Sequence, residues 1–435
     1  MDLKDKLVSS FATLQEQNDA AHQIRQEAFE QFETLGFPTK KLEAWKYTSL
    51  NSVLKTDFNL FPTSATTLSF EDVKPYFVHE IDAYKVVFVD GVFNAELSNI
   101  DTEGFEVTLM SKALNDAEHK AVIEKYFNSI AKKDESLTSL NTAFTKEGTF
   151  IHIPKSKVAD KPIQLLHFAT GTENALFLQP RNLVVVEENA QVQIIERHQS
   201  LTDNATLTNA VTEMFVAKHA NLDYYKIQND KLTASLIDNT YISQEGQSNA
   251  SVHTFSFGGK ITRNNLNYYQ KGEYIDSTLK GITILEGKQH VDHYTLVDHV
   301  EPNCESHQNY KGIFAEKSTG VFNGKIYVDK IAQKTNAFQQ NNNILLDDTA
   351  TINTKPQLEI FADDVKCSHG CTIGQLDAEA MFYLKTRGIP EKEAKGLLTY
   401  AFANNVLESV RIPELQARVN KLIAEKLGVN LGFDQ

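Results

Sequence analysis

A spaced repeat of short apolar segments in the middle of the chain limits its possible folds more than any other feature. From about residue 148 to about residue 374, apolar runs of strand length alternate with Asn, Gly, Asp and Thr. Within this stretch Asn189–Val192, Ala220–Leu222 and Asn249–Val252 resemble one another, with alanines at 190, 220 and 250. A fixed period of short strands is typical of a coiled parallel sheet, in which each coil covers its neighbour. We therefore expect a mainly β chain whose core, residues 148–375, is a right-handed parallel β-helix.

The polar run Gln339–Asn343 lies inside this repeat and has two interpretations. Amide-rich tracts are often low-complexity, disordered segments. Here Ile344–Leu346 follows at once and would belong to the core. We therefore expect an amide-rich turn that stacks on the next coil.

Helical periodicity marks both ends of the chain. Apolar residues recur at gaps of mostly three and four over residues 3–35, which predicts one amphipathic helix that ends at Gly36 and Pro38. A mixed region follows, with a strand expected over 84–89. Together these segments predict an N-terminal, mostly helical α+β domain over residues 1–147.

Residues 376–435 are expected to form a C-terminal helical domain, whose last helix begins at Pro413 and ends at Gly428. Such helices either cap the end of a solenoid, which needs a polar cover, or bind a partner. The periodicity alone leaves both roles open. An apolar stripe at helical spacing consists of Leu397, Leu398, Ala401, Phe402 and Val406.

Two of the three cysteines flank a histidine near the end of the β region, at Cys367, His369 and Cys371. Side chains two residues apart on a strand point to the same face, so an extended chain aligns these donors, with Asp363 and Val365 leading in. Thiolate and imidazole suit zinc, copper(I) and iron–sulfur chemistry. Three donors in a straight row do not close a four-ligand site, so we interpret them as half a metal site that another surface completes. The alternative is that the cysteines are small apolar residues of an ordinary strand.

The other candidate donors are less clearly arranged. His290, His293 and His299 form one group, and Cys304 and His307 form another. His290 and His293 would face opposite sides of a strand, so only a turn or bulge would bring both to one metal ion. We expect ordinary structural positions for the first group and leave the second open.

Composition excludes several classes of function. Lys and Arg total 43 against 57 Asp and Glu, a net charge of −14, which argues against nucleic-acid binding. Three cysteines form no disulfide framework and fit a reducing compartment. We find neither an apolar signal core nor an apolar stretch of about 18 residues, so we expect a cytoplasmic protein without a membrane span. Gly320–Ile326 is too short for a phosphate loop and lacks the Ser or Thr that holds magnesium, so we expect no ATP hydrolysis.

Several motifs together resemble the SufB/SufD family, the scaffold proteins of an iron–sulfur cluster assembly machine. The match is densest at A-D-D-V-K-C-S-H-G (362–370), L-K-T-R-G-I-P (384–390) and A-K-G-L-L-T-Y-A-F (394–402), and continues at 42–48, 320–325 and 332–346. The first run and the 42–48 segment are most similar to SufD. Cys371 departs from the pattern, because SufD-like chains commonly carry a small residue there.

The resemblance implies a non-catalytic scaffold subunit. It implies a heterodimer with a SufB-like paralogue through the end of the β-helix, or a homodimer when the chain is isolated. Cys367 and His369 would hold a transient iron–sulfur cluster or iron at that junction. Cys371 is a candidate additional ligand through its spacing alone, since the family pattern does not include a thiol there. The family complex is also associated with reduced flavin, but this chain has no dinucleotide fingerprint. The C-terminal helices would bind a SufC-like ABC ATPase through Leu397, Leu398, Ala401 and Phe402.

The competing hypothesis is a carbohydrate-active β-helix enzyme. Such enzymes act through pairs of carboxylates, and Asp363 and Asp364 are adjacent. On a strand these two side chains point to opposite faces and cannot share a proton. These enzymes are also typically exported, so we favour the scaffold hypothesis.

Overall fold

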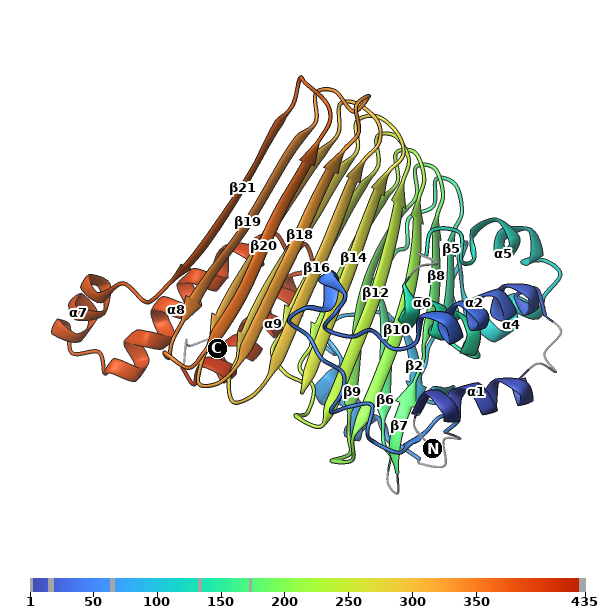
Figure 1. Cartoon of the computed structure of the whole chain (residues 1–435), viewed down its shortest axis with the longest axis horizontal. Coiled ribbons are helices and arrows are strands. Elements are labelled where there is room, and N and C mark those ends of the chain that lie inside the picture. The colour runs from blue at the N-terminus through green and yellow to red at the C-terminus, as the bar shows by residue number, and fades with distance from the viewer. Residues whose placement is uncertain (1–2, 15–18, 63–66, 132–134, 172–173, 430–435) are drawn as a thin grey trace.

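The structure, a computed structural model, is a parallel β-solenoid with helices along its sides (Figure 1). It describes residues 3–14, 19–62, 67–131, 135–171 and 174–429. Within these residues the strands form two sheets, of 11 and 10 strands, and the main apolar core lies between them. Each coil of the chain adds one strand to each sheet. The predicted mainly β fold with a parallel β-helix core is confirmed.

The 11-stranded sheet consists of β1 (Phe58–Asn59), β4 (Glu106–Leu109), β5 (Thr149–Ile153), β7 (Ala175–Leu178), β8 (Arg181–Val186), β10 (Thr206–Val216), β12 (Ala234–Gln244), β14 (Ile261–Gln270), β16 (His290–His299), β18 (Thr319–Val328) and β20 (Thr351–Ile360). Its order is β20-β18-β16-β14-β12-β10-β8-β5-β4, with β7 paired to β10 and to β1. The 10-stranded sheet consists of β2 (Tyr84–Val89), β3 (Val92–Phe93), β6 (Ile163–Ala169), β9 (Gln191–Ser200), β11 (Asn221–Gln228), β13 (Asn249–Ser256), β15 (Asp276–Leu285), β17 (Glu305–Phe314), β19 (Asn336–Leu345) and β21 (Lys366–Gly374). Its order is β21-β19-β17-β15-β13-β11-β9-β6-β2-β3.

The strands pair in parallel along both sheets, except where β3 and β4 end the stack in antiparallel pairing with β2 and β5. Thr206 of β10 pairs with Ala234 of β12 in one coil. Thr319 of β18 pairs with Thr351 of β20 in a later coil, which takes a longer stretch of chain to complete one turn. The coil length therefore varies around the period that the sequence suggested.

Only two of the three equally spaced alanines occupy equivalent positions in successive coils. Ala190 and Ala220 are both fully buried beside a corner of the solenoid. In the next coil the corresponding buried residue is Ser248, and Ala250 instead pairs with Leu222 on the strand. That coil is shorter than the one before it, in which Leu222 pairs with Val192. Ala250 is therefore not the structural equivalent of Ala190 and Ala220, although the coils do recur at a similar spacing along the chain.

The amide run Gln339–Asn343 belongs to strand β19, so the predicted turn is wrong. Gln339, Asn341 and Asn343 alternate with exposed or half-buried neighbours and are buried. The Gln339 side-chain amide donates to Gln308 Oε1 of the preceding coil at 3.2 Å, and the Asn343 amide donates to Asn341 Oδ1 at 2.8 Å. Amides that satisfy one another can line the inside of a solenoid, which is why a polar run continues the strand. The predicted stacking on a neighbouring coil is confirmed.

The N-terminal segment folds as two helices, α1 (Leu3–Leu14) and α2 (His22–Leu35), so the prediction of one continuous helix is wrong. Residues 15–18 lie outside the described residues. The rings of Phe11 and Phe29 stack with centroids 3.8 Å apart, because the two helices turn their apolar faces toward each other.

The remaining N-terminal helices are α3 (Phe70–Val73), α4 (Met110–Asn115), α5 (Lys120–Tyr126) and α6 (Ser136–Phe144), with 3₁₀ turns at Glu43–Trp45 and Lys74–Tyr76. Helices α1, α2 and α6 pack with residues of β7, β10, β12 and β14 in one apolar cluster. The expected strand over 84–89 is β2. The N-terminal region therefore contributes strands to both sheets as well as helices to the outside.

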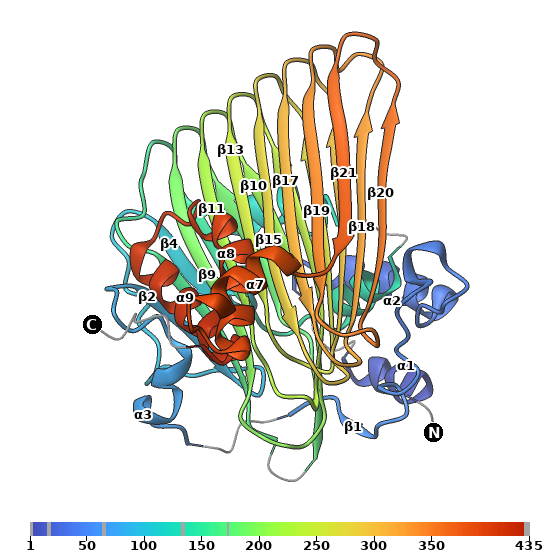
Figure 2. The same ribbon diagram turned by 90° about the vertical axis from the view of Figure 1, so that its left-hand side faces the viewer.

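The C-terminal helices are α7 (Ala378–Thr386), α8 (Glu391–Leu407) and α9 (Pro413–Leu427), and α9 ends at Gly428 as predicted. Helices α8 and α9 pack against the outer side of the 10-stranded sheet, as Figure 2 shows. Val406 and Leu407 of α8 share an apolar cluster there with Phe255, Ile282 and Ile313. The helices cover a side of the solenoid rather than its end, so the capping interpretation is wrong.

Candidate functional site

Cys367, His369 and Cys371 lie on β21, the last strand of the 10-stranded sheet; we call these three residues the donor row. Each lies opposite an inward-facing, buried residue of β19: Ala337, Gln339 and Asn341. Within the described residues no further coil follows β21, so the inward-facing positions are uncovered there. Cys367 is half-buried, whereas His369 and Cys371 are exposed. The three donors therefore share one face of β21. Strand β21 lies at the uncovered end of the solenoid (Figure 2).

The other strand at this end is β20, and we call the pair β20 and β21 the open end. The hydroxyl oxygen of Thr354 on β20 lies 3.1 Å from the sulfur of Cys371. Three apolar side chains are exposed nearby: Ile360, Phe361 and Ile373. A surface with exposed apolar groups and uncovered strands is suited to contact with another protein.

The chemistry of the donor row differs from residue to residue. Cys367 packs against an apolar cluster that includes Val328 and Ala337. Burial raises the pKa of the Cys367 thiol, although the Ala337 backbone acts in the opposite direction. The thiol is therefore protonated at neutral pH, and a metal ion must displace the proton in order to bind.

The donor row does not by itself form a closed metal site. Successive donors two residues apart on a strand are separated by about 7 Å along it. Within the described residues, ligand atoms converge to within 4.8 Å in two groups, and neither contains a member of the donor row. The row therefore presents donors to a second surface, which agrees with its interpretation as half a site.

One detail of the sequence-based interpretation is wrong. Asp363 and Asp364 lie in the bend between β20 and β21 rather than on a strand, so Asp363 does not lead into the donor row. The chain must turn here to pass from one sheet to the other, and Lys334 N–H donates to the Asp364 carbonyl across this corner at 2.5 Å. Gly320–Ile326, for which we expected no phosphate loop, lies within strand β18.

The remaining candidate donors have structural contacts. His290 and His293 have different partners on β16: His290 Nε2 lies 2.8 Å from the Thr48 hydroxyl, and His293 Nε2 lies 2.8 Å from the Thr283 hydroxyl. The buried Cys304 thiol lies 3.1 Å from the carbonyl oxygen of Gly272, and burial raises its pKa to about 11. These contacts explain the three residues without a metal ion.

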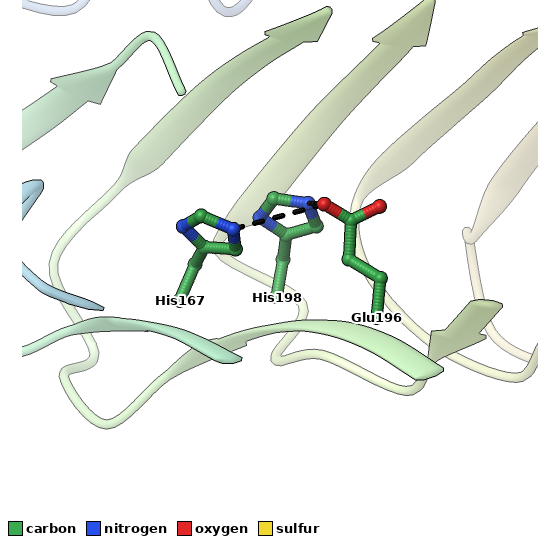
Figure 3. Close-up of side chains that lie close together, drawn as sticks. All are labelled: His167, Glu196 and His198. Carbon is green, nitrogen blue, oxygen red and sulfur yellow. Dashed lines mark ion pairs between the residues drawn. The ribbon is translucent and has the colours of Figure 1, made fainter. Parts of the chain in front are cut away.

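Sequence reasoning missed a buried group formed by His167, Glu196 and His198 (Figure 3). Glu196 and His198 are two residues apart on β9, and His167 on β6 pairs with His198 in the register of the sheet. The spacing of Glu196 and His198 was a signal in the sequence. The third member could be found only with the coil register, which sequence motifs do not give at this end of the solenoid.

The predicted partner stripe on α8 is divided by the structure. Leu397 and Leu398 are half-buried and Ala401 is exposed, whereas Val406 is buried against the sheet. Phe402 faces the solenoid, since Lys311 Nζ lies 4.7 Å from its ring centroid and donates to its carbonyl oxygen at 2.7 Å. The predicted stripe did not include α7, a helix that the sequence does indicate, which has no buried residue and exposes 70% of Phe382.

Comparison with known sequences covers nearly all of the chain. A sequence model of the SUF system FeS cluster assembly SufBD core domain matches residues 167–402, and one of the SufBD protein N-terminal region matches residues 9–165. The chain is 33% identical to an iron–sulfur cluster assembly SufBD family protein of Synechocystis over 408 residues, which cover 92% of this chain and 90% of that one. It is 31% identical to the iron–sulfur cluster assembly protein SufD of Escherichia coli over 411 residues, 92% of each chain. The SufD protein of Bacillus subtilis is 26% identical over 320 residues, 71% of each chain. In the described part of the chain, we find no helix with the length and apolar character needed to span a membrane.

Proposed function

Because this chain belongs to the SufBD family of iron–sulfur cluster assembly proteins, we propose that it is a SufD-like scaffold subunit that helps to form a nascent cluster, or to acquire iron, at its open end. The observation that carries this proposal is the donor row on the last uncovered coil. Cluster irons take thiolate or imidazole ligands, usually four in all. Cys367 and His369 supply two of these ligands, and the partner supplies the others. The cluster is cargo, and Cys371 is an additional ligand at most.

A SufB-like paralogue is the partner that this end fits. The Lys366 N–H donates to the Thr335 carbonyl at 2.8 Å, so alternate residues of β21 turn their backbone groups to β19 and the others turn theirs to the free edge. The donor row belongs to the second set. On β20 the same alternation puts Pro356, which has no N–H, at a free-edge position, as is usual for an edge strand. A second solenoid can therefore add its strands to both edges.

The partner-binding surface for an ABC ATPase would be formed by α7 and the exposed part of α8. Leu397, Leu398 and Ala401 remain accessible, together with Phe382 and Tyr383 of α7. We assign Phe402 to the attachment of α8 to the sheet. An ATPase bound here sits beside the open end, since α7 follows β21 directly in the chain. Nucleotide-driven movement of the ATPase would then be transmitted to the contact between the open end and the SufB-like partner.

Co-expression with candidate SufB-like and SufC-like chains, followed by purification without oxygen, tests the proposal. The wild-type complex should show the visible absorption of an iron–sulfur cluster. Cys367→Ala and His369→Ala should leave the complex assembled and lower its iron and sulfide content several-fold, because small side chains near an interface contribute ligands rather than packing. Cys371→Ala is the matched control and should lower the iron and sulfide content less than the other two substitutions do. Wild-type cluster content in both Cys367→Ala and His369→Ala would show that the donor row is not a ligand set.

Two further outcomes would redirect the proposal. If the isolated chain forms a dimer that holds iron through its own open ends, the scaffold is homodimeric. If the ATPase fails to bind and Ala401→Asp and Phe382→Asp change nothing, the helical surface has another role. The carbohydrate-enzyme hypothesis is disfavoured because sequence models of the SufBD family match nearly all of the chain.

A further inference from the structure

Three metal-binding side chains converge inside the solenoid, far from the open end in the order of the strands (Figure 3). His167 is on β6, and Glu196 and His198 are on β9. The exposed fractions of the three residues are 6%, 2% and 6%. Their inward-facing neighbours on the same strands, such as Leu165 and Ile194, belong to the main apolar core. Ionisable groups at such positions need a specific explanation.

The nitrogen atoms that point to Glu196 lack hydrogen bonds. His167 Nε2 and His198 Nε2 lie 3.7 Å and 3.6 Å from Glu196 Oε1, beyond normal hydrogen-bond length. Neither nitrogen has another hydrogen-bond partner among the described residues, and the same holds for His198 Nδ1. Metal–ligand bonds of about 2.1 Å hold ligand atoms about 3.0–3.4 Å apart. A small movement of the side chains would therefore bring all three donors to one ion.

The charge of the group also calls for a cation. In the described part of the chain, Glu196 forms no ion pair with lysine or arginine, and the nearby Lys226 is paired with Asp238 at 2.7 Å. A neutral imidazole has one ring nitrogen without a proton, and that nitrogen can act as a metal ligand. A buried carboxylate without a cation is unfavourable. A divalent ion bound between the carboxylate and the two imidazoles would supply positive charge at this position.

Neighbouring residues hold the donors in place. The Tyr224 hydroxyl donates to Glu196 Oε2, and the Asn182 amide donates to Glu196 Oε1 at 3.1 Å. Burial and the Glu196 charge raise the pKa of Tyr224 well above its usual value, so the hydroxyl stays a donor. The His167 ring is stacked on the ring of His198, with centroids 4.6 Å apart. Such outer contacts fix the orientation of ligands in metal sites.

A cavity of about 170 Å³ reaches one member of the group, His167, from the surface. Its lining includes buried His167 and Phe88 at the inner side and exposed Gly91 and Lys146 at the outer side. The cavity gives an ion a path of entry and room for water ligands. His167 is thus accessible from the cavity, although all three side chains are buried.

We propose that His167, Glu196 and His198 bind one divalent first-row transition-metal ion inside the solenoid. Two imidazoles and one carboxylate are ligands that suit ions such as iron(II), zinc(II) and cobalt(II). Water from the cavity completes the coordination. The site is separate from the donor row, and the inference does not depend on the function proposed above.

Cobalt(II) is the probe for the test, because its visible absorption reports ligand geometry. The full chain, stripped with a chelator, should bind one cobalt(II) ion in this site, and Glu196→Gln and His198→Gln should each weaken binding by about 10–100-fold. His307→Gln is the control variant, because His307 belongs to the other convergent group, with Asp276 and Glu305, and is only half-buried. Cys367→Ala controls for the donor row. Both control variants should bind as the wild type does.

X-ray absorption of cobalt in the wild-type chain decides the question even if a core variant fails to fold. Scattering from two imidazoles and light oxygen ligands supports the site. Scattering from sulfur, loss of binding in His307→Gln or Cys367→Ala, or absence of stoichiometric binding would overturn the proposal. Unchanged binding in folded Glu196→Gln and His198→Gln would overturn it as well.

Discussion

The two ends of the solenoid use the same inward-facing positions for different purposes. On β2, near the N-terminal end, these positions hold Tyr84 and Phe88, which are 6% and 1% exposed. The antiparallel strand β4 and its neighbours cover this closed end (β2–β5). On β21 the equivalent positions hold Cys367 and His369 and are uncovered. An inward position is therefore a core position only where another element covers it, and at the open end the chain places ligand donors there instead.

The largest expected difference between the two ends is in their tolerance of a charge. Val107 of β4 is 5% exposed, so Val107→Asp buries an unpaired carboxylate at the closed end. We expect it to lower the free energy of unfolding by about 4 kcal/mol or more, or to prevent folding. Ile373→Asp, at a position that is 50% exposed, should change it by about 0.5 kcal/mol or less. Denaturant unfolding of both variants measures this; equal losses would show that the open end is part of the folding core.

A pair of proline substitutions on β21 sharpens the comparison at the level of single backbone groups. Thr372 pairs with Asn342 and turns its N–H to β19, so Thr372→Pro should cost about 2–3 kcal/mol of unfolding free energy. Ile373 turns its N–H to the free edge, so Ile373→Pro should leave the isolated chain stable and weaken binding of the SufB-like partner. Thermal unfolding and a pull-down separate the two effects. Full partner binding by a folded Ile373→Pro chain would rule out strand addition at this edge.

The interior and the open end should also differ in their response to pH. Burial lowers the pKa of His293 from 6.5 to about 4. The unfolded chain keeps the ordinary value, so it binds more protons than the folded chain below pH 6.5, and stability falls as the pH falls. At pH 5 this residue should account for a loss of about 2 kcal/mol. Urea unfolding at pH 7 and pH 5 should show a smaller loss for His293→Gln, and no change in the loss for the exposed His369→Gln. The same pH dependence in wild type and His293→Gln would contradict this.

The sequence predicts the open end better than it predicts the interior. The donor row follows from alternation along one strand, and local spacing is visible in a single sequence. The group of His167, Glu196 and His198 depends on which residues of different coils lie side by side, and coils of unequal length blur that register. The split between α1 and α2 was missed for a related reason. Leu14 and Ala21 are seven residues apart, which keeps the helical phase across the polar residues 15–18. Only the stacking of Phe11 on Phe29 shows that the helices pack on each other.

The capping question could not be settled from the sequence either. An apolar stripe on a helix has the same periodicity whether it packs on the side of a solenoid or on its end. The contacts of Val406 and Leu407 with the 10-stranded sheet decide it, and they leave β20 and β21 free. This is the fact on which the functional account rests.

Residue-resolved hydrogen exchange of the free chain and of its complex with the SufB-like partner tests that account most directly. The backbone N–H groups of Cys367, His369 and Cys371 face the free edge, so they should exchange fast in the free chain and become protected in the complex. Those of Ser368 and Gly370, which face β19, should be protected in both states. Fast exchange of the donor row in an assembled complex would contradict the claim that the partner binds at the open end.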